Sequence, residues 1–208
     1  MKILFDGVKE FSRGDFEANR ELFTRISESH NPHTLFIGCS DSRVVPDLIT
    51  KSLPGDLFVI RNIANVVPPY RQSSEYLATT SAIEYAVTML HVENIVVCGH
   101  SNCGGCRALF LSDEETKGIP HTMKWLELAR AAKTKAEEIV RHIGADSGME
   151  WLVEQENIVE QMNHLLTYPY VEERYEKGEL NIYGWYYEIG TGQIFNYNNS
   201  SKVFEEIE

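Results

Sequence analysis

The sequence lacks any apolar run near the roughly 20 residues that a membrane-spanning helix needs. At its start only Ile3, Leu4 and Phe5 separate Lys2 from Asp6, which is too short for the apolar core of a secretory signal peptide. Basic residues are also scarce: 19 Lys and Arg stand against 31 Asp and Glu, a formal net charge of −12. A chain this acidic is repelled by phosphate backbones. These absences predict a cytoplasmic protein that binds neither a membrane nor a nucleic acid.

Cysteines are few, with four in 208 residues: Cys39, Cys98, Cys103 and Cys106. In a chain without an export signal, cysteines are more often metal ligands, catalytic groups or core residues than disulfides. Cys98 lies within an apolar run and is predicted to be a buried core thiol. The other three stand beside glycines and polar residues, which makes them candidates for chemistry.

Short apolar runs alternate with helical patterns along the chain. The runs have the length of buried strands and cover residues 34–37, 57–60 and 95–98. Amphipathic helical spacing covers residues 5–29, 75–90, 121–142 and 149–166. Late in the chain, residues 180–189 and 193–197 alternate like strands around a Gly-Thr-Gly turn at 190–192. We expect one domain over residues 1–208, with residues 1–30 as a helical arm.

This alternation predicts an α/β fold with a mostly parallel central sheet, an antiparallel edge strand and flanking helices. In such sheets, functional sites form beyond the carboxyl ends of the strands. The first predicted strand stops at Cys39 and the third stops at His100. We therefore expect these two residues to share one site.

A zinc ion is the expected occupant, because zinc takes thiolate and imidazole ligands in a tetrahedron. His100 and Cys103 are three residues apart at the start of an expected helix, so one turn would bring both to one metal. Cys39 supplies a third ligand from the neighbouring strand end. Two thiolates neutralise Zn²⁺, and the fourth position is left to water or, in a closed form, to Asp41. An open position is typical of catalytic zinc, not structural zinc.

Six segments together resemble the β-class carbonic anhydrases over nearly the whole chain: residues 39–43 (CSDSR), 54–62 (PGDLFVIRN), 67–69 (VPP), 83–87 (IEYAV), 99–104 (GHSNCG) and 184–187 (GWYY). The resemblance implies reversible hydration of carbon dioxide to bicarbonate by a hydroxide on the zinc. It also implies intertwined homodimers, or dimers paired into homotetramers, with active sites at the dimer interface. The N-terminal helices would embrace the partner subunit.

The resemblance also implies roles for individual residues. Asp41 would accept a hydrogen bond from the zinc hydroxide. Arg43 would form a bidentate ion pair with Asp41 and keep that carboxylate off the metal. Further residues align with those that surround the substrate: Phe58, Ile63 and Tyr85 with the walls of an apolar pocket, and the Gly104 N–H with a donor near it.

Two positions depart from the family pattern. Many relatives carry a glutamine nine residues before the first zinc cysteine, where its side chain reaches the substrate across the dimer interface. Here that residue is His30, which is either a substrate contact or proton carrier, or a surface histidine before a turn. One subgroup binds regulatory bicarbonate with a tryptophan three residues before that cysteine. Here Phe36 takes that place, although Arg61 is present, so we expect an open site without that switch.

Other functions fit parts of the pattern. The same fold and zinc could hydrolyse carbonyl sulfide or carbon disulfide. Cys103-Gly-Gly-Cys106 also has the spacing of a redox motif, and a non-catalytic zinc scaffold or redox sensor is the alternative from another class. A redox motif of the thioredoxin type does not predict Cys39, Asp41 and Arg43.

Overall fold

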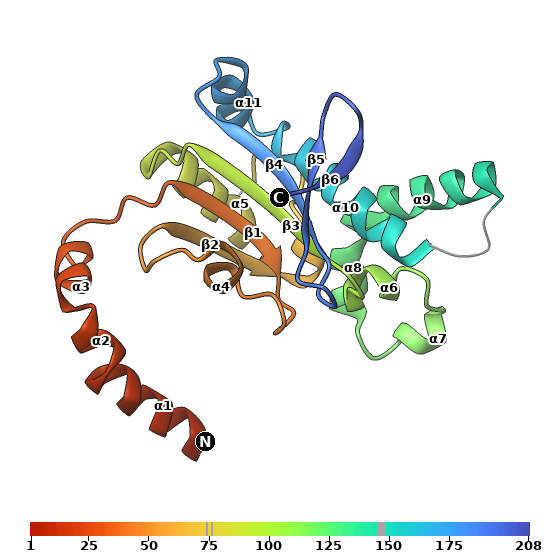
Figure 1. The fold of residues 1–208 in the computed structure, drawn as a ribbon. Helices are drawn as coiled ribbons and strands as arrows, with labels where there is room; N and C mark the ends of the chain where they lie inside the picture. The colour runs from red at the N-terminus through yellow and green to blue at the C-terminus, as the bar shows by residue number, and fades with distance from the viewer. Residues whose placement is uncertain (74, 76, 145–148) are drawn as a thin grey trace.

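The computed structural model of the chain describes residues 1–73, 75, 77–144 and 149–208 (Figure 1). Within these residues the sheet has six strands in the order β2-β1-β3-β4-β5-β6. The strands are β1 (Thr34–Cys39), β2 (Leu57–Asn62), β3 (Asn94–His100), β4 (Asn181–Tyr187), β5 (Ile194–Asn198) and β6 (Val203–Glu206). The first four in this order are parallel, and β5 and β6 are antiparallel. The predicted α/β class with an antiparallel edge is therefore confirmed.

The central strands are apolar because both of their faces are covered. Every residue of β1 is buried, and so is β3 from its second residue onward. The strand β2 lies at one edge of the sheet and is only partly buried. The three predicted apolar runs thus correspond to β1, β2 and β3, three of the four parallel strands, and each of these strands is two or three residues longer than its run.

One face of the sheet carries the larger core. Four elements pack there: α5 (Ala78–Glu84), the π-helical turn Tyr85–Met89, α10 (Met149–Leu165) and α11 (Pro169–Glu176). The opposite face holds a smaller cluster of Phe36, Val96 and Cys98 beneath Ile49 of α4 (Pro46–Thr50). Cys98 is fully buried there, as expected for a core thiol.

A third cluster lies at the carboxyl end of the parallel strands. It is formed by α6 (Gly104–Ala108), α8 (Pro120–Leu126), the 3-10 turn Glu127–Ala129, α9 (Arg130–Ile143) and the start of α10. The short helix α7 (Asp113–Thr116) connects α6 to α8 and begins with a capping box on Ser112. The helix expected over 121–142 is therefore two helices joined by a tighter turn.

The acidic residues Glu205 and Glu206 near the C-terminus are exposed to solvent and yet form part of the sheet. Both belong to β6, where they pair with Asn196 and Phe195 of β5. The reason is the alternation of residues 203–206, whose Phe204 packs against Tyr197 and Tyr186.

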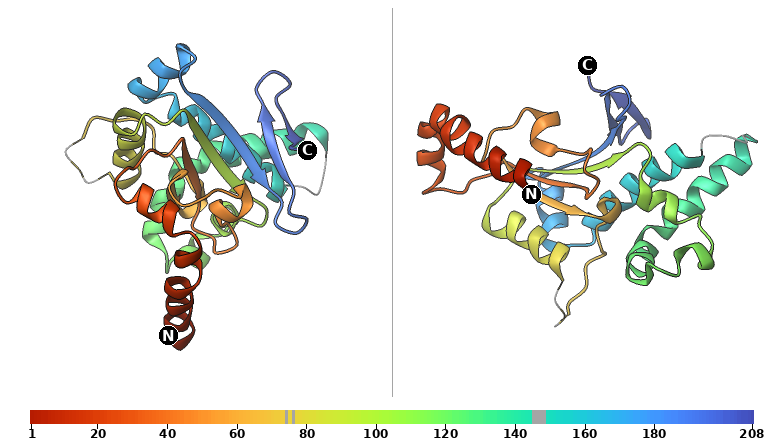
Figure 2. Two further views of the ribbon diagram at one scale, coloured as in Figure 1. Left: turned by 60° about the vertical axis from the view of Figure 1, so that its left-hand side comes forward. Right: turned by 90° about the horizontal axis from the view of Figure 1, so that it is seen from below.

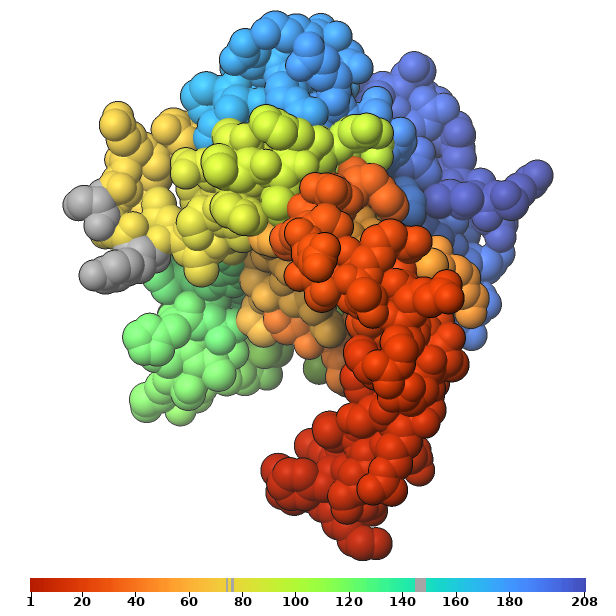
Figure 3. Space-filling model, turned by 90° about the vertical axis from the view of Figure 1, so that its left-hand side faces the viewer, coloured from red at the N-terminus to blue at the C-terminus, as the bar shows by residue number. Residues whose placement is uncertain are grey.

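The N-terminal arm consists of α1 (Lys2–Arg13), α2 (Asp15–Ala18) and α3 (Arg20–Ile26), as the sequence predicts. None of its helical residues is buried. The arm projects from the sheet, at the end of the molecule opposite to α9 (Figure 2), and it stands clear of the body in the space-filling view (Figure 3). No helix in the described ranges has the length and apolarity that crossing a bilayer would require.

Gly184 in β4 allows α10 to lie directly on the sheet. A Cβ atom at this position would lie 2.5 Å from Met162 Sδ and 2.8 Å from Ile158 Cγ2. We predict that Gly184→Ala lowers the free energy of unfolding by about 1–3 kcal/mol, because the added methyl overpacks this contact. Urea unfolding measures the change. Gly118→Ala is the matched control, since nothing lies within 4 Å of its Cβ position, and an equal loss in both variants would contradict the packing argument.

Candidate metal centre

Three candidate ligands converge at the carboxyl end of the sheet. Cys39 ends β1, His100 ends β3, and Cys103 precedes the first residue of α6. Their donor atoms all lie within 4.8 Å of one another, and all three residues are buried. β1 and β3 are neighbouring parallel strands, so their ends meet at the same edge, as the sequence predicts.

The orientation of His100 suits a metal ligand. Its Nδ1 lies 3.0 Å from the Ser101 carbonyl oxygen, which can only accept a hydrogen bond, so Nδ1 carries the proton. Its Nε2 is buried and has no hydrogen-bond partner among the described residues. A buried lone pair without a partner is costly, and coordination of a cation at Nε2 removes that cost.

The two thiols also fit a cation. Contact with the Cys103 thiol, together with burial, raises the pKa of Cys39 to about 12. Contact with the Cys106 thiol, again together with burial, raises the pKa of Cys103 to about 12. Without a positive charge between them these thiols keep their protons, whereas a bound divalent cation displaces both. The donor set of two sulfurs and one imidazole is one that zinc prefers.

The expected placement of His100 and Cys103 on one helical turn is wrong. His100 is the last residue of β3, and Cys103 only caps α6. The chain turns between them at Asn102, whose φ of 55° is left-handed, so a turn and not a helix brings the two ligands together. The physical reason is that β3 stays paired with β4 as far as His100 and Tyr187.

Asp41 and Arg43 form a forked ion pair beside this cluster. Arg43 Nε donates to Asp41 Oδ1 at 2.9 Å, and Arg43 Nη2 donates to Asp41 Oδ2 at 2.7 Å. The Arg43 backbone N–H also donates to Oδ1 at 2.9 Å. These hydrogen bonds hold the pKa of Asp41 far below its usual range. The Asp41 carboxylate is therefore ionised. Its Oδ2 lies 3.9 Å from His100 Nε2, so the carboxylate is adjacent to the position of the metal.

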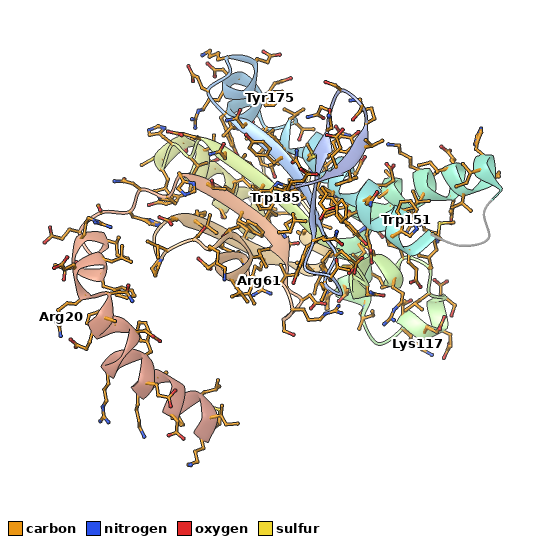
Figure 4. The ribbon with its side chains drawn as sticks, in the orientation of Figure 1. Arg20, Arg61, Lys117, Trp151, Tyr175 and Trp185 are labelled. Carbon is orange, nitrogen blue, oxygen red and sulfur yellow. The ribbon has the colours of Figure 1, made fainter. Side chains whose placement is uncertain are left out.

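Arg61, which the sequence relates only to a bicarbonate switch, binds the backbone next to the candidate ligands in the structure. Its Nε donates to the Cys39 carbonyl at 3.0 Å, and its Nη2 donates to the Asp41 carbonyl at 2.6 Å. Figure 4 labels Arg61 near the carboxyl end of β2. Arg61 thus fixes the backbone on both sides of Ser40, a role indicated by its strand register opposite Gly38.

Glu154 of α10 contacts the backbone of a candidate ligand, and the sequence does not indicate this. It is 4 % exposed, accepts a hydrogen bond from the Cys103 N–H at 2.7 Å, and accepts another from the Tyr186 hydroxyl at 3.0 Å. Burial raises the pKa of its carboxyl group. Its contact with Cys103 spans 51 residues of sequence, and no local pattern could reveal it.

The predicted pocket residues fall into two groups. Ile63 and Gly104 lie with the metal ligands: Gly104 begins α6, and Ile63 follows β2 and packs against the neighbouring Gly105. His30, Phe58 and Tyr85 form a separate aromatic row with 6.0 Å between successive ring centroids. Phe58 pairs with Leu35, four residues before Cys39, which places it about 13 Å along the strand from the metal ligands.

The candidate ligands lie in the part of the chain that matches a known protein family. The profile of the carbonic anhydrase family matches residues 34–194, which contain all three candidate ligands and the Asp41–Arg43 pair. A carbonic anhydrase of Helicobacter pylori is 42% identical over 206 residues, covering 98% of this chain and 93% of that protein. The chain belongs to the β-class carbonic anhydrases.

Solved structures agree with this assignment. The β-carbonic anhydrase CcaA superposes with a TM-score of 0.93 at 36% identity, covering all of this chain and 92% of that one. One of two tetrameric β-carbonic anhydrases from Sordaria macrospora superposes with a TM-score of 0.82 at 30% identity, covering 94% of this chain and 95% of that one. Family membership and the ligand cluster confirm the predicted enzyme class, the reversible hydration of carbon dioxide, and zinc as the cofactor.

The Ser101 backbone that orients His100 is itself held by Glu188. The Ser101 hydroxyl donates to Glu188 Oε1 at 2.8 Å and accepts from the Ile189 N–H at 3.0 Å. We predict that Glu188→Ala weakens zinc binding about 10-fold, because partners behind a metal-binding histidine typically contribute that much. Competition with a chelator measures the affinity. Glu188→Gln keeps an acceptor oxygen and should bind zinc normally; equal affinities in all three proteins would refute the role.

Proposed function

We propose that Cys39, His100 and Cys103 hold the catalytic zinc and that Asp41 and Arg43 orient the reaction on carbon dioxide. The observation that carries this assignment is the forked Asp41–Arg43 pair, which lies directly beside three converging ligands. A structural zinc site would close all four positions with protein ligands. Here the fourth candidate, Asp41, has both carboxylate oxygens engaged by Arg43, which supports an open site.

When bound, zinc acidifies a water molecule so that it can attack carbon dioxide near neutral pH. Asp41 remains ionised beside the metal site, and its role is to accept a hydrogen bond from the attacking group, which directs the lone pair of that group at the substrate carbon. Arg43 prevents Asp41 from reaching the metal, and Arg43 is itself anchored by the Asn102 carbonyl at 3.1 Å. Phe36, in place of a tryptophan, supports an enzyme without the bicarbonate switch.

Removal of Arg43 tests these roles. In Arg43→Ala, Asp41 loses both guanidinium hydrogen bonds and becomes free to occupy the fourth zinc position. We predict that carbon dioxide hydration falls about 100-fold or more through this misplacement, while zinc content stays at the wild-type level. Stopped-flow hydration and metal analysis measure the two quantities. Arg71→Ala, which removes another arginine of an ion pair on the surface, should change neither, and normal hydration by Arg43→Ala would disprove the assignment.

We also propose that the complete site needs two chains in a homodimer. The row of His30, Phe58 and Tyr85 lies too far from the ligands of its own chain to line the same pocket. Phe58 lies in β2, the strand at one edge of the sheet. Several large apolar residues around this edge are 38–65% exposed: Leu48, Leu53, Val59, Tyr85 and Met89. An apolar surface of this kind is typical of a protein interface.

A two-fold axis at this edge would complete the pocket. If two β2 strands meet in antiparallel fashion about Ile60, the partner's Phe58 comes opposite Asn62, the residue that pairs with Cys39. The partner's aromatic row then reaches the metal end of the sheet, where Ile63 lies. The exposed apolar residues of the arm, Ile3, Leu4, Phe5 and Val8, are 59–86% exposed, and burial against the partner would stabilise the dimer.

Mixed dimers test the shared site. Phe58→Ala should raise KM for carbon dioxide about 3- to 10-fold, because part of the apolar wall is lost. Asp41→Asn should be inactive. In a dimer of these two variants, one site combines an intact Asp41 with the partner's intact Phe58, so we predict that coexpression with the inactive variant restores a wild-type KM. The double variant Asp41→Asn/Phe58→Ala is the control and should give no restoration. Failure of Asp41→Asn to restore KM would place Phe58 outside a shared site.

Pairing of dimers into a homotetramer fits the Sordaria structures, which are described as tetrameric. A cytoplasmic location is supported by the cysteines, since all four are free and buried.

A further inference from the structure

The turn after β2 has an unfavourable backbone conformation. Ala64 has a φ of 60° and Asn65 a φ of 47°, both left-handed and both without glycine's freedom. The two residues are 0% and 1% exposed. Such conformations persist only where the surrounding structure determines them fully. The contacts that hold this turn are therefore part of what shapes the site.

Some of these contacts are local. The Asn62 side chain accepts from the Val66 N–H at 2.8 Å and donates to the Val66 carbonyl at 2.9 Å, which closes the turn. Trp125 of α8 donates its indole N–H to the Ile63 carbonyl at 3.0 Å. They hold the two sides of the turn but leave the Ala64 carbonyl and the Val67 N–H to be satisfied elsewhere.

Two buried amides of α10 satisfy those groups. Asn157 Nδ2 donates to the Ala64 carbonyl at 2.9 Å, and Gln161 Oε1 accepts from the Val67 N–H at 2.8 Å. Gln161 Nε2 also donates to Asn157 Oδ1 at 2.9 Å. This last bond fixes which end of each amide faces the turn. Asn157 is 1% exposed and Gln161 is fully buried, so water cannot replace them readily.

On its other side the turn touches α6, the helix that begins directly after the candidate ligand Cys103. A Cβ atom at Gly105 would lie 2.9 Å from Ala64 Cβ and 3.0 Å from Ile63 Cγ2. Gly105 is two residues after Cys103. The turn therefore lies between α10 and α6, with Ile63 40% exposed next to the metal centre.

We propose that Asn157 and Gln161 are positioning residues for carbon dioxide: they hold the left-handed turn so that Ile63 stands as a fixed wall of the substrate space. Neither amide touches the substrate. The inference rests on the proposed role of Ile63 in the pocket. A turn released from α10 would let Ile63 move, and the apolar contact with substrate would weaken while the zinc ligands stay in place.

The test compares Gln161→Met and Asn157→Ala with the control Asn163→Ala. Asn163 is an exposed residue of the same helix. We expect KM for carbon dioxide to rise about 5- to 10-fold in the two variants with kcat within about twofold, because lost substrate binding appears in KM. Asn163→Ala should match the wild type. Zinc content, and the visible spectrum of the cobalt-substituted protein, should be unchanged in all three. An unchanged KM in both variants, or an altered cobalt spectrum, would overturn the proposal.

A double-mutant cycle separates this inference from the function on which it rests. If the amides act through Ile63, Gln161→Met should have no further effect on KM in an Ile63→Ala background. Effects that multiply would refute positioning through Ile63. If Ile63→Ala alone leaves KM unchanged, the proposed wall is wrong; if only Ile63→Ala raises KM, the wall stands and the role of the amides is wrong.

Discussion

The structure depends on one constraint: two thiolates and an imidazole must meet a single cation at the edge of a parallel sheet. Cys39 and His100 reach it because β1 and β3 are hydrogen-bonded neighbours that end at the same level. Cys103 reaches it through a turn at Asn102. Asp41 Oδ2 then lies 3.9 Å from the imidazole, and both of its carboxylate oxygens accept hydrogen bonds from Arg43. In the proposed open site, Arg43 and the metal compete for this carboxylate.

Much of this could be predicted from the sequence, because the informative features are local. The buried strands are continuous apolar runs, and each ligand strand stops at its ligand, so both the parallel sheet and the Cys39–His100 pairing follow. Other features are not local. Glu154 contacts Cys103 across 51 residues, and no spacing rule connects them. The path from His100 to Cys103 was predicted wrongly because a spacing of three residues fits a helical turn and a tight turn equally well.

The separation of the predicted pocket residues into two groups is also a feature that sequence spacing does not reveal. Phe58 and Ile63 are only five residues apart in the sequence, which suggests that they line one pocket together. Strand geometry separates them, because an extended chain rises about 3.3 Å per residue. An exposed edge strand with apolar residues around it would be a liability for a monomer. In the proposed homodimer the partner would cover that edge and bring its aromatic row to the metal centre, so one contact between chains would serve both stability and catalysis.

Helix α10 shows how an irregular site can be built next to a regular core. Backbone groups outside helices and strands still need hydrogen-bond partners when they are buried. The segments that carry Cys103 and Ile63 are of this kind. Along one side of α10, Glu154 binds the Cys103 N–H, Asn157 the Ala64 carbonyl and Gln161 the Val67 N–H. Their spacing of three and four residues places them on one face. Buried polar residues would weaken an ordinary core helix. Here they supply the hydrogen bonds that a neighbouring strand would otherwise give to the segments of Cys103 and Ile63. This explains why α10 buries them on the face that adjoins the zinc site.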